Sequence, residues 1–140
     1  MRTLEKNAVA SNLHYPFPYL FKSVKVVSMN YDLRKKIIAS IYHAGSGHPG
    51  GALSAIDIMA VLFKDFLKLT RHNLDHYERD RFILSKGHAA PALYALAESI
   101  GILNKDAVKG LRKFGTPLQG HTDRKYLPWV EASTGSLGQG

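Results

Sequence analysis

The chain has 140 residues, of which 45% are hydrophobic, and this length suits one small domain at most. The absence of cysteine excludes a disulfide framework, a Cys-ligated zinc site and thiol catalysis, and no apolar run reaches the roughly 18 residues that span a bilayer. The net charge of +8 is compatible with binding to nucleic acid, membranes or phosphorylated small molecules. The basic residues are scattered, however, and are not interleaved with aromatic residues. We therefore expect neither a nucleic-acid nor a membrane partner.

Residues 1–28 differ from the rest of the chain. They contain two prolines within an aromatic cluster at residues 15–19 and show no clear helical period. They also lack the unbroken apolar core and the small-residue cleavage site of a secretory signal. We interpret residues 1–28 as a leader or N-terminal extension and residues 29–140 as the domain, with Met29 as the simplest candidate for the biological start.

The next elements are two predicted helices joined by a glycine-rich loop. Apolar residues at helical spacing predict a helix over residues 31–44, which Gly45 is placed to end. The GSGHPG segment, residues 45–50, contains three glycines and a proline and is predicted to be a loop. Ser54 and Asp57 resemble a capping box that opens a helix over about residues 54–67, which is apolar on most sides and predicted to be buried.

Further along, a strand followed by helices is predicted. The short apolar run at residues 81–85 predicts a buried strand, and a helix over residues 89–99 follows, with Pro91 in its first turn and Gly101 after its end. A shorter helix over residues 104–113, a possible strand at residues 129–132 and a helix entered at residues 133–140 complete the pattern. These elements predict an α/β fold, in which an incomplete parallel sheet is flanked by helices.

Three histidines follow a glycine: His48, His88 and His121. Glycine allows the backbone to bend sharply and to approach a ligand, and histidine exchanges a proton readily near neutral pH. We therefore predict one polar pocket assembled from separate loops. Taken alone, the His48 turn is better read as a rigid turn with an incidental histidine, and the His121 turn as an ordinary surface loop. The remaining histidines lack the glycine context and receive no site role: His14, His43, His72 and His76.

His88 stands at the predicted junction between a strand and a helix. In open α/β sheets, ligands bind beyond the carboxyl ends of the strands, and a helix N-terminus offers free N–H groups to a phosphate. His88 is therefore placed to reach a diphosphate or a sugar oxygen. A histidine that merely caps the helix is the alternative.

Three segments together resemble the thiamine-diphosphate-binding N-terminal region of transketolases: GSGHPGGALSAIDIMAVLF, DRFILSKGHAAPALYALAE and QGHTDRKYLPWVEASTGSLGQG. The resemblance runs from about residue 31 to residue 140. It implies the start of a thiamine-diphosphate-binding fold and an enzyme that transfers a two-carbon ketol unit between sugar phosphates. A related family, 1-deoxyxylulose-5-phosphate synthase, shares the first two segments in looser form, so a fragment of that kind is an alternative.

The resemblance also implies roles for individual residues. His48 would line the channel near the reactive carbon, His88 would reach the cofactor diphosphate and the substrate, and His121 would contact hydroxyls of the donor substrate. The segment that would pack around the cofactor consists of Gly135, Ser136 and Leu137. Many transketolases have proline in place of Ser136 and asparagine in place of Lys86.

The cofactor implied is thiamine diphosphate with Mg²⁺. The family holds the metal with a GDG motif and a later asparagine, both beyond the matched segment, so no metal ligand is assigned here and the isolated chain is expected to be inactive. The implied partners are sugar-phosphate substrates, a homodimer partner, and a C-terminal transketolase region that belongs to the same chain or to a separate one. The implied location is the cytoplasm. A truncated relic without activity, a partner-binding module and, more distantly, a basic nucleic-acid binder are the other readings.

Overall fold

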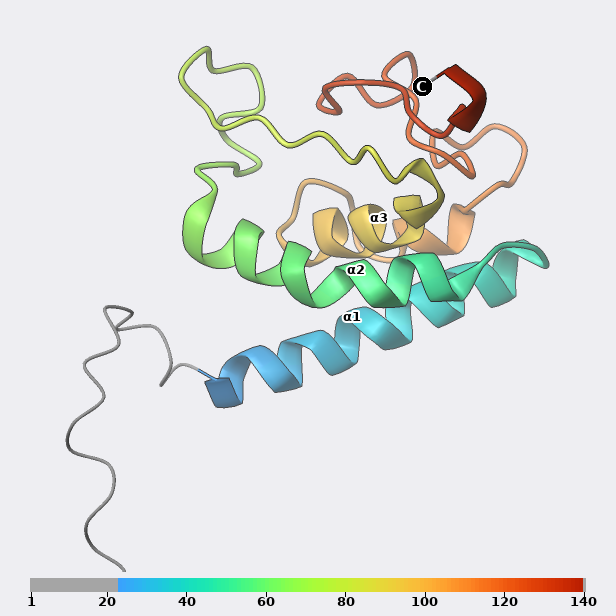
Figure 1. Ribbon diagram of the computed structural model, residues 1–140, viewed down its shortest axis with the longest axis horizontal. Helices are drawn as coiled ribbons and strands as arrows, with labels where there is room; N and C mark the ends of the chain where they lie inside the picture. Colours follow the sequence, from blue (N-terminus) through green and yellow to red (C-terminus); the bar gives the residue numbers. More distant parts are fainter. Residues whose placement is uncertain (1–22, 140) are drawn as a thin grey trace, which may run out of the picture.

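The computed structural model describes residues 23–139, and its framework is a stack of three α-helices (Figure 1). They are α1 (Ser23–Ala44), α2 (Pro49–Val61) and α3 (Ala90–Ser99), and each contacts the other two. The predicted leader lies mostly outside the described residues. Helix α1 begins eight residues before the predicted start, because no proline or glycine interrupts the sequence between Pro18 and Gly45.

The corner between α1 and α2 forms partly as predicted. Gly45 adopts a φ of +66° and ends α1, as expected for a glycine after a helix. Helix α2 begins at Pro49 and not at Ser54, so the predicted loop is too long and the predicted capping box is wrong. Proline is tolerated in the first turn of a helix, where its missing N–H would have no partner. The helix continues through a π-helical turn, Leu62–Phe66, close to the predicted end.

The hydrophobic core lies where the three helices meet. Helix α3 is buried along its whole length from Ala90 to Ala97, because α1 and α2 cover one side and the later loops cover the other (Figure 1). Alanines on α3 allow the helices to approach closely. Two ion pairs tie the stack together: Arg34 with Asp57 at 2.6 Å lies at the surface, and Lys36 with Glu98 is partly buried. The larger buried side chains of the three helices are Leu33, Ile37, Ile56, Met59, Leu93, Tyr94 and Leu96.

The predicted strand at residues 81–85 does not form. The segment crosses the molecule above α2 and α3 as an irregular stretch (Figure 1), and its side chains alternate between exposed and more buried positions as they would in a strand. A strand requires a neighbouring strand to pair with, and residues 23–139 include no strand at all. The expected parallel sheet is therefore not among the described residues, although the helices that would flank it are.

The later elements are shorter than predicted. The helix expected over residues 104–113 is reduced to a 3-10 turn, Ala107–Gly110, after Asp106 in a left-handed conformation with a φ of +67°. The strand expected at residues 129–132 is irregular, and the helix expected from Ser133 is a single 3-10 turn, Leu137–Gln139. Gly101, by contrast, follows α3 with a φ of +78°, as predicted.

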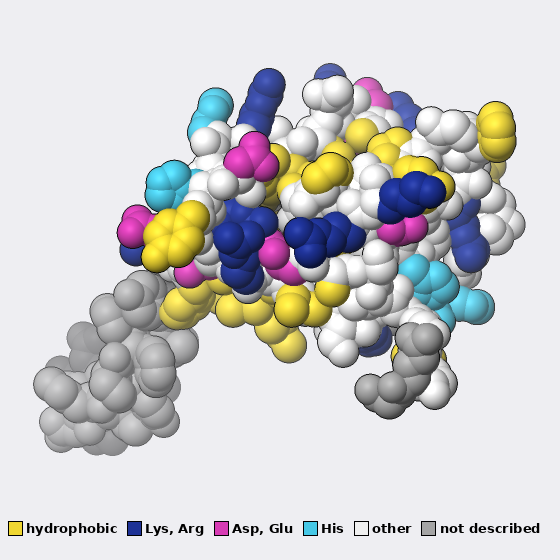
Figure 2. Space-filling model, turned by 90° about the horizontal axis from the view of Figure 1, so that it is seen from above, with side chains coloured by type: hydrophobic (Ala, Val, Ile, Leu, Met, Phe, Trp, Pro, Cys, Tyr) yellow, Lys and Arg dark blue, Asp and Glu magenta, His cyan; other side chains and the backbone are white. Residues whose placement is uncertain are grey.

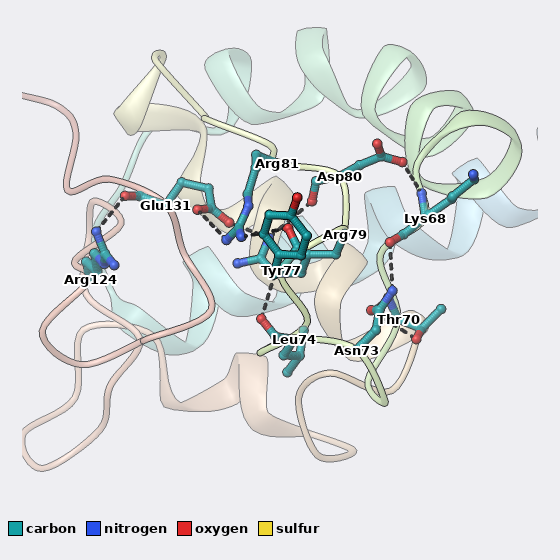
Figure 3. Close-up of polar contacts among 10 residues, drawn as sticks. All are labelled: Lys68, Thr70, Asn73, Leu74, Tyr77, Arg79, Asp80, Arg81, Arg124 and Glu131. Atoms are coloured by element: carbon teal, nitrogen blue, oxygen red, sulfur yellow. Dashed lines mark hydrogen bonds and ion pairs between the residues drawn. The ribbon is translucent and has the colours of Figure 1, made fainter.

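A buried arginine holds these irregular segments together (Figure 3). Arg79 is 7% exposed; it forms an ion pair with Glu131 and donates to the carbonyl oxygens of Leu74 at 2.5 Å and Asp80 at 3.1 Å. Arg81 reaches the same carboxylate at 3.4 Å. Because a buried charge is costly without a partner, this cluster fixes the chain before residue 85 against the chain before residue 133. Side chains thus replace the missing strand pairing.

The molecular surface carries mixed charge. Basic side chains are spread over the face in Figure 2, with acidic side chains between them. None of the helices among the described residues is both long enough and apolar enough to cross a membrane.

Candidate functional site

The three glycine–histidine turns meet at one hollow of about 130 Å³. His48 precedes the first residue of α2, His88 lies in the 3-10 turn Gly87–Ala89 directly before α3, and His121 lies in the loop layer above the helices. The predicted pocket built from separate loops is therefore present. Its lining residues are Ser46, Gly47, His48, His88, Pro91, Leu111, Arg112, Gly120 and His121.

Two of the histidines are in direct contact. The rings of His88 and His121 meet edge to face, with 4.5 Å between their centres and 89° between their planes. The Nε2 atom of His121 is buried and has no hydrogen-bond partner in the described part of the chain. Burial lowers the pKa of His121, and the neighbouring His88 and Arg112 lower it further. These effects favour the neutral imidazole of His121, whose buried Nε2 has no partner among the described residues.

Two glycines let the backbone approach these rings. Gly135 has a φ of +113°, and a Cβ there would lie 2.7 Å from the Cγ of His121. A Cβ at Gly87 would lie 2.5 Å from the backbone nitrogen of Gly135. Because real Cβ atoms do not come so close, only glycine fits at either position. The backbone of the Gly135 segment therefore lies directly against the His88 and His121 turns.

Two threonines, Thr122 and Thr134, fix this arrangement. The hydroxyl of Thr134 donates to the carbonyl oxygen of Leu84 at 2.7 Å and lies 2.9 Å from the hydroxyl of Thr122. The backbone nitrogen of Thr134 also donates to the carbonyl oxygen of Thr122 at 3.2 Å. Thr134 thus joins the segments before His88 and after His121. Sequence reasoning missed this role, because the partners lie 12 and 50 residues away.

Tyr94 anchors the His121 turn from below. Its ring is buried in the core on α3, and its hydroxyl lies 3.0 Å from the carbonyl oxygen of Gln119 and 3.1 Å from that of His121. Burial raises the pKa of Tyr94 well above its usual range, and the negative charge of Asp123 adds to this effect. The hydroxyl therefore remains a hydrogen-bond donor. No sequence pattern distinguished Tyr94 from the other apolar residues of its helix.

The other predicted positions lie outside the hollow. Ser136 and Leu137 are exposed, with Leu137 at 75%, and neither lines the hollow. His14 lies outside the described residues, and three further histidines are exposed away from the site: His43, His72 and His76. Lys86 donates to the hydroxyl of Ser54 at 2.8 Å and so links the His88 turn to α2.

Comparison with known proteins places the chain in a family. Residues 27–140 match the family described as transketolase, thiamine diphosphate binding domain. The chain belongs to the transketolase family. Human transketolase is 44% identical over 108 residues, which make up 77% of this chain and 17% of that protein. The solved transketolase of Leishmania mexicana aligns with a TM-score of 0.76 and 34% identity, over 82% of this chain and 17% of that one.

One further relative carries the word subunit in its name. The 6-deoxy-6-sulfo-D-fructose transketolase subunit SqwG of Clostridium sp. is 40% identical over 108 residues. These residues make up 77% of this chain and 39% of that relative, so the chain spans well under half the length of the curated relatives it matches. The matched residues fall within the thiamine diphosphate binding domain of the family, and the remainder of each relative is unmatched.

The site fits the cofactor that the family implies. His121 has a buried ring nitrogen with no protein partner among the described residues, and this suits a polar ligand at the hollow. The glycines at 87 and 135 are explained by packing of the chain on itself, because a Cβ at Gly87 would meet the backbone of residues 134–135 and a Cβ at Gly135 would meet the ring of His121. The described residues include no cluster of three or more histidine, aspartate or glutamate side chains that could hold a metal ion, so no Mg²⁺ ligand is assigned.

Proposed function

We propose that this chain forms part of a transketolase-type enzyme that transfers a two-carbon ketol unit between sugar phosphates. The observation that carries the proposal is the convergence of His48, His88 and His121 on one hollow. The backbone of Gly135 packs against the ring of His121. Thiamine diphosphate, held with Mg²⁺, would supply the nucleophilic carbon and take up the electron pair left by cleavage of the ketose. The metal ligands and a homodimer partner would come from outside the described residues, and the enzyme would work in the cytoplasm.

The three histidines would handle the substrate protons. A neutral His121 can accept a hydrogen bond from a donor-substrate hydroxyl through Nε2, and its depressed pKa preserves this capacity at neutral pH. His88, in edge contact with His121, would reach both the diphosphate and the substrate. His48 precedes the first turn of α2 and would complete the wall near the reactive carbon. Gly135, Ser136 and Leu137 would lie along the cofactor.

A binding measurement with a matched pair of glycine variants tests the cofactor part of the proposal. In Gly135→Ala, the new methyl group meets the His121 ring, whereas a Cβ at Gly138 meets nothing within 4 Å. Calorimetric titration with thiamine diphosphate and Mg²⁺ would be carried out on a hybrid, in which residues 27–140 replace the matching segment of human transketolase. We expect Gly135→Ala to weaken binding at least tenfold and Gly138→Ala to leave it unchanged. Equal affinities would contradict the assignment of Gly135.

A further inference from the structure

Arg112 lies between two hollows of the site and is not one of the predicted site residues. It lines the hollow of the three histidines and a neighbouring hollow of about 540 Å³, which also includes Asp123 and Ser133. No ion pair found among the described residues includes Arg112. Its positive charge therefore faces the histidines without a direct ion pair among the described residues.

The chain holds Arg112 in an unusual backbone conformation. Its φ is +59°, in the left-handed region that residues with a side chain rarely adopt. The flanking residues explain how this is maintained: Leu111 and Leu118 are both buried in the core, and the backbone nitrogen of Arg112 donates to the carbonyl oxygen of Leu118 at 2.8 Å. The turn between the two leucines directs the arginine side chain back over the hollow.

The guanidinium group contacts two of the three histidine loops. Its NH1 donates to the hydroxyl of Ser46, two residues before His48, at 3.1 Å. On the other side it lies against Gly120, where a Cβ would be 2.6 Å from Nε and 2.9 Å from NH2. A side chain at position 120 would therefore displace the end of the Arg112 side chain. One side chain spans the gap between the His48 loop and the His121 loop.

We propose that Arg112 is a positioning residue of this site: its guanidinium joins the His48 loop to the His121 loop and sets the electrostatic environment of the His121 imidazole. The groups that face His121 are His88 through its ring, Arg112 beside Gly120, His48 across the hollow, and Tyr94 through its hydroxyl beneath the backbone. Asp123 lines the neighbouring hollow. Arg112 is the one permanent positive charge among these groups, and like charge disfavours protonation of a nearby imidazole.

The contribution of Arg112 to ketol transfer rests on the proposed function, but its effect on His121 does not. The test therefore uses the unliganded 140-residue chain and requires no turnover. Proton NMR follows the ring signals of His121 and of the exposed His43 against pH in wild type, Arg112→Gln, Arg112→Lys and Arg34→Gln. Arg34, paired with Asp57 between α1 and α2, is the matched control for loss of one arginine charge.

We expect Arg112→Gln to raise the pKa of His121, Arg112→Lys to keep it near the wild-type value, and Arg34→Gln to leave it unchanged. The His43 midpoint should not move in any variant. An unchanged His121 midpoint in a folded Arg112→Gln, or an equal rise in Arg34→Gln, would overturn the electrostatic part of the proposal.

A second variant tests the link between the loops even where Arg112→Gln does not fold. Ser46→Ala removes the hydroxyl that accepts from NH1 and leaves the arginine charge in place. We expect the backbone amide signals of Gly120 and His121 to shift in Ser46→Ala, although Ser46 lies more than 70 residues away in the sequence. The exposed Ser99→Ala, whose hydroxyl bonds only the carbonyl oxygen of Leu96 in its own helix, is the control. If the Gly120 and His121 signals respond equally in both variants, or in neither, Arg112 does not connect the two loops.

Discussion

The helical layer and the loop layer of this protein have different roles. The three helices bury leucine, isoleucine and alanine against one another, and their contacts arise from simple periodic patterns. The loop layer, formed by residues 81–88 and 111–139, has little regular structure. It is held by polar contacts from Arg79, Tyr94 and Thr134 and by a few buried apolar side chains, Leu84, Leu111, Leu118, Leu127 and Val130. The comparison indicates that the helices supply stability, whereas the loops supply the histidines and the glycines that form the site.

A core substitution in the helical layer should have the largest effect on stability. Leu96 on α3 is buried at the meeting point of the helices. Leu96→Ala leaves a cavity there and should lower the free energy of unfolding by about 2–5 kcal/mol, as measured by urea denaturation. The exposed Leu137→Ala in the loop layer is the control and should change it by less than about 0.5 kcal/mol. Similar losses would show that the two layers share the stabilising role.

The next largest effect should come from the polar cluster that fixes the loop layer. Glu131→Gln removes the negative charge that pairs with buried Arg79 but keeps the shape of the side chain. We expect a loss of about 1–3 kcal/mol in the free energy of unfolding. Limited proteolysis should reveal faster cleavage in the loops than in α1 to α3. Uniform loss of protection across the chain would mean that the cluster belongs to the core.

Removal of a single hydroxyl should have a smaller effect on stability and a sharper effect on the site. Thr134→Val keeps the shape of the side chain but loses the hydrogen bonds to Leu84 and Thr122. The expected cost is about 1 kcal/mol. The contact between Gly135 and the His121 ring should weaken, and NMR should detect this as a smaller nuclear Overhauser effect between them. An unchanged contact would show that the glycines alone position the segment.

Acid should weaken the loop layer slightly through His121. Its pKa is lower in the folded chain than in the unfolded chain, so the unfolded chain binds the proton first as the pH falls. Stability is therefore full above the unfolded pKa of about 6.5 and decreases below it until the folded pKa is passed. Thermal melting at pH 8 and pH 5 should show a larger fall for wild type than for His121→Gln. An identical fall would mean that His121 is not the responsible group.

The two layers also differ in what the sequence could predict. Sequence reasoning located all three helices, the first of them from hydrophobic periodicity, and it correctly placed Gly45 and Gly101, both left-handed, after helix ends. The early start of α2 was missed because Pro49 reads as a loop signal, although it occupies the first turn of the helix. The strand at residues 81–85 was predicted from local composition alone. A strand needs a partner, and the described residues supply none.

The sequence predicted the histidines of the site but not the residues that support them. The repeated glycine–histidine pattern is local in sequence, and the structure brings all three turns to one hollow. Tyr94, Thr134 and Arg112 act on segments that lie close only after folding, so no spacing indicated them. Ser136 and Leu137 were assigned from resemblance and lie exposed beside the site, and their role along the cofactor remains a prediction.

The central claim is that the loop layer is built for reaction and not for stability. The direct test measures ketol transfer and melting temperature for the hybrid of human transketolase that carries residues 27–140, with His88→Ala, His121→Ala and the exposed His43→Ala. We predict losses in rate of about 10²–10⁴-fold for the first two, little change for His43→Ala, and similar melting temperatures throughout. A loss for His43→Ala as large as that for His88→Ala, or unchanged rates for both site variants, would contradict the claim.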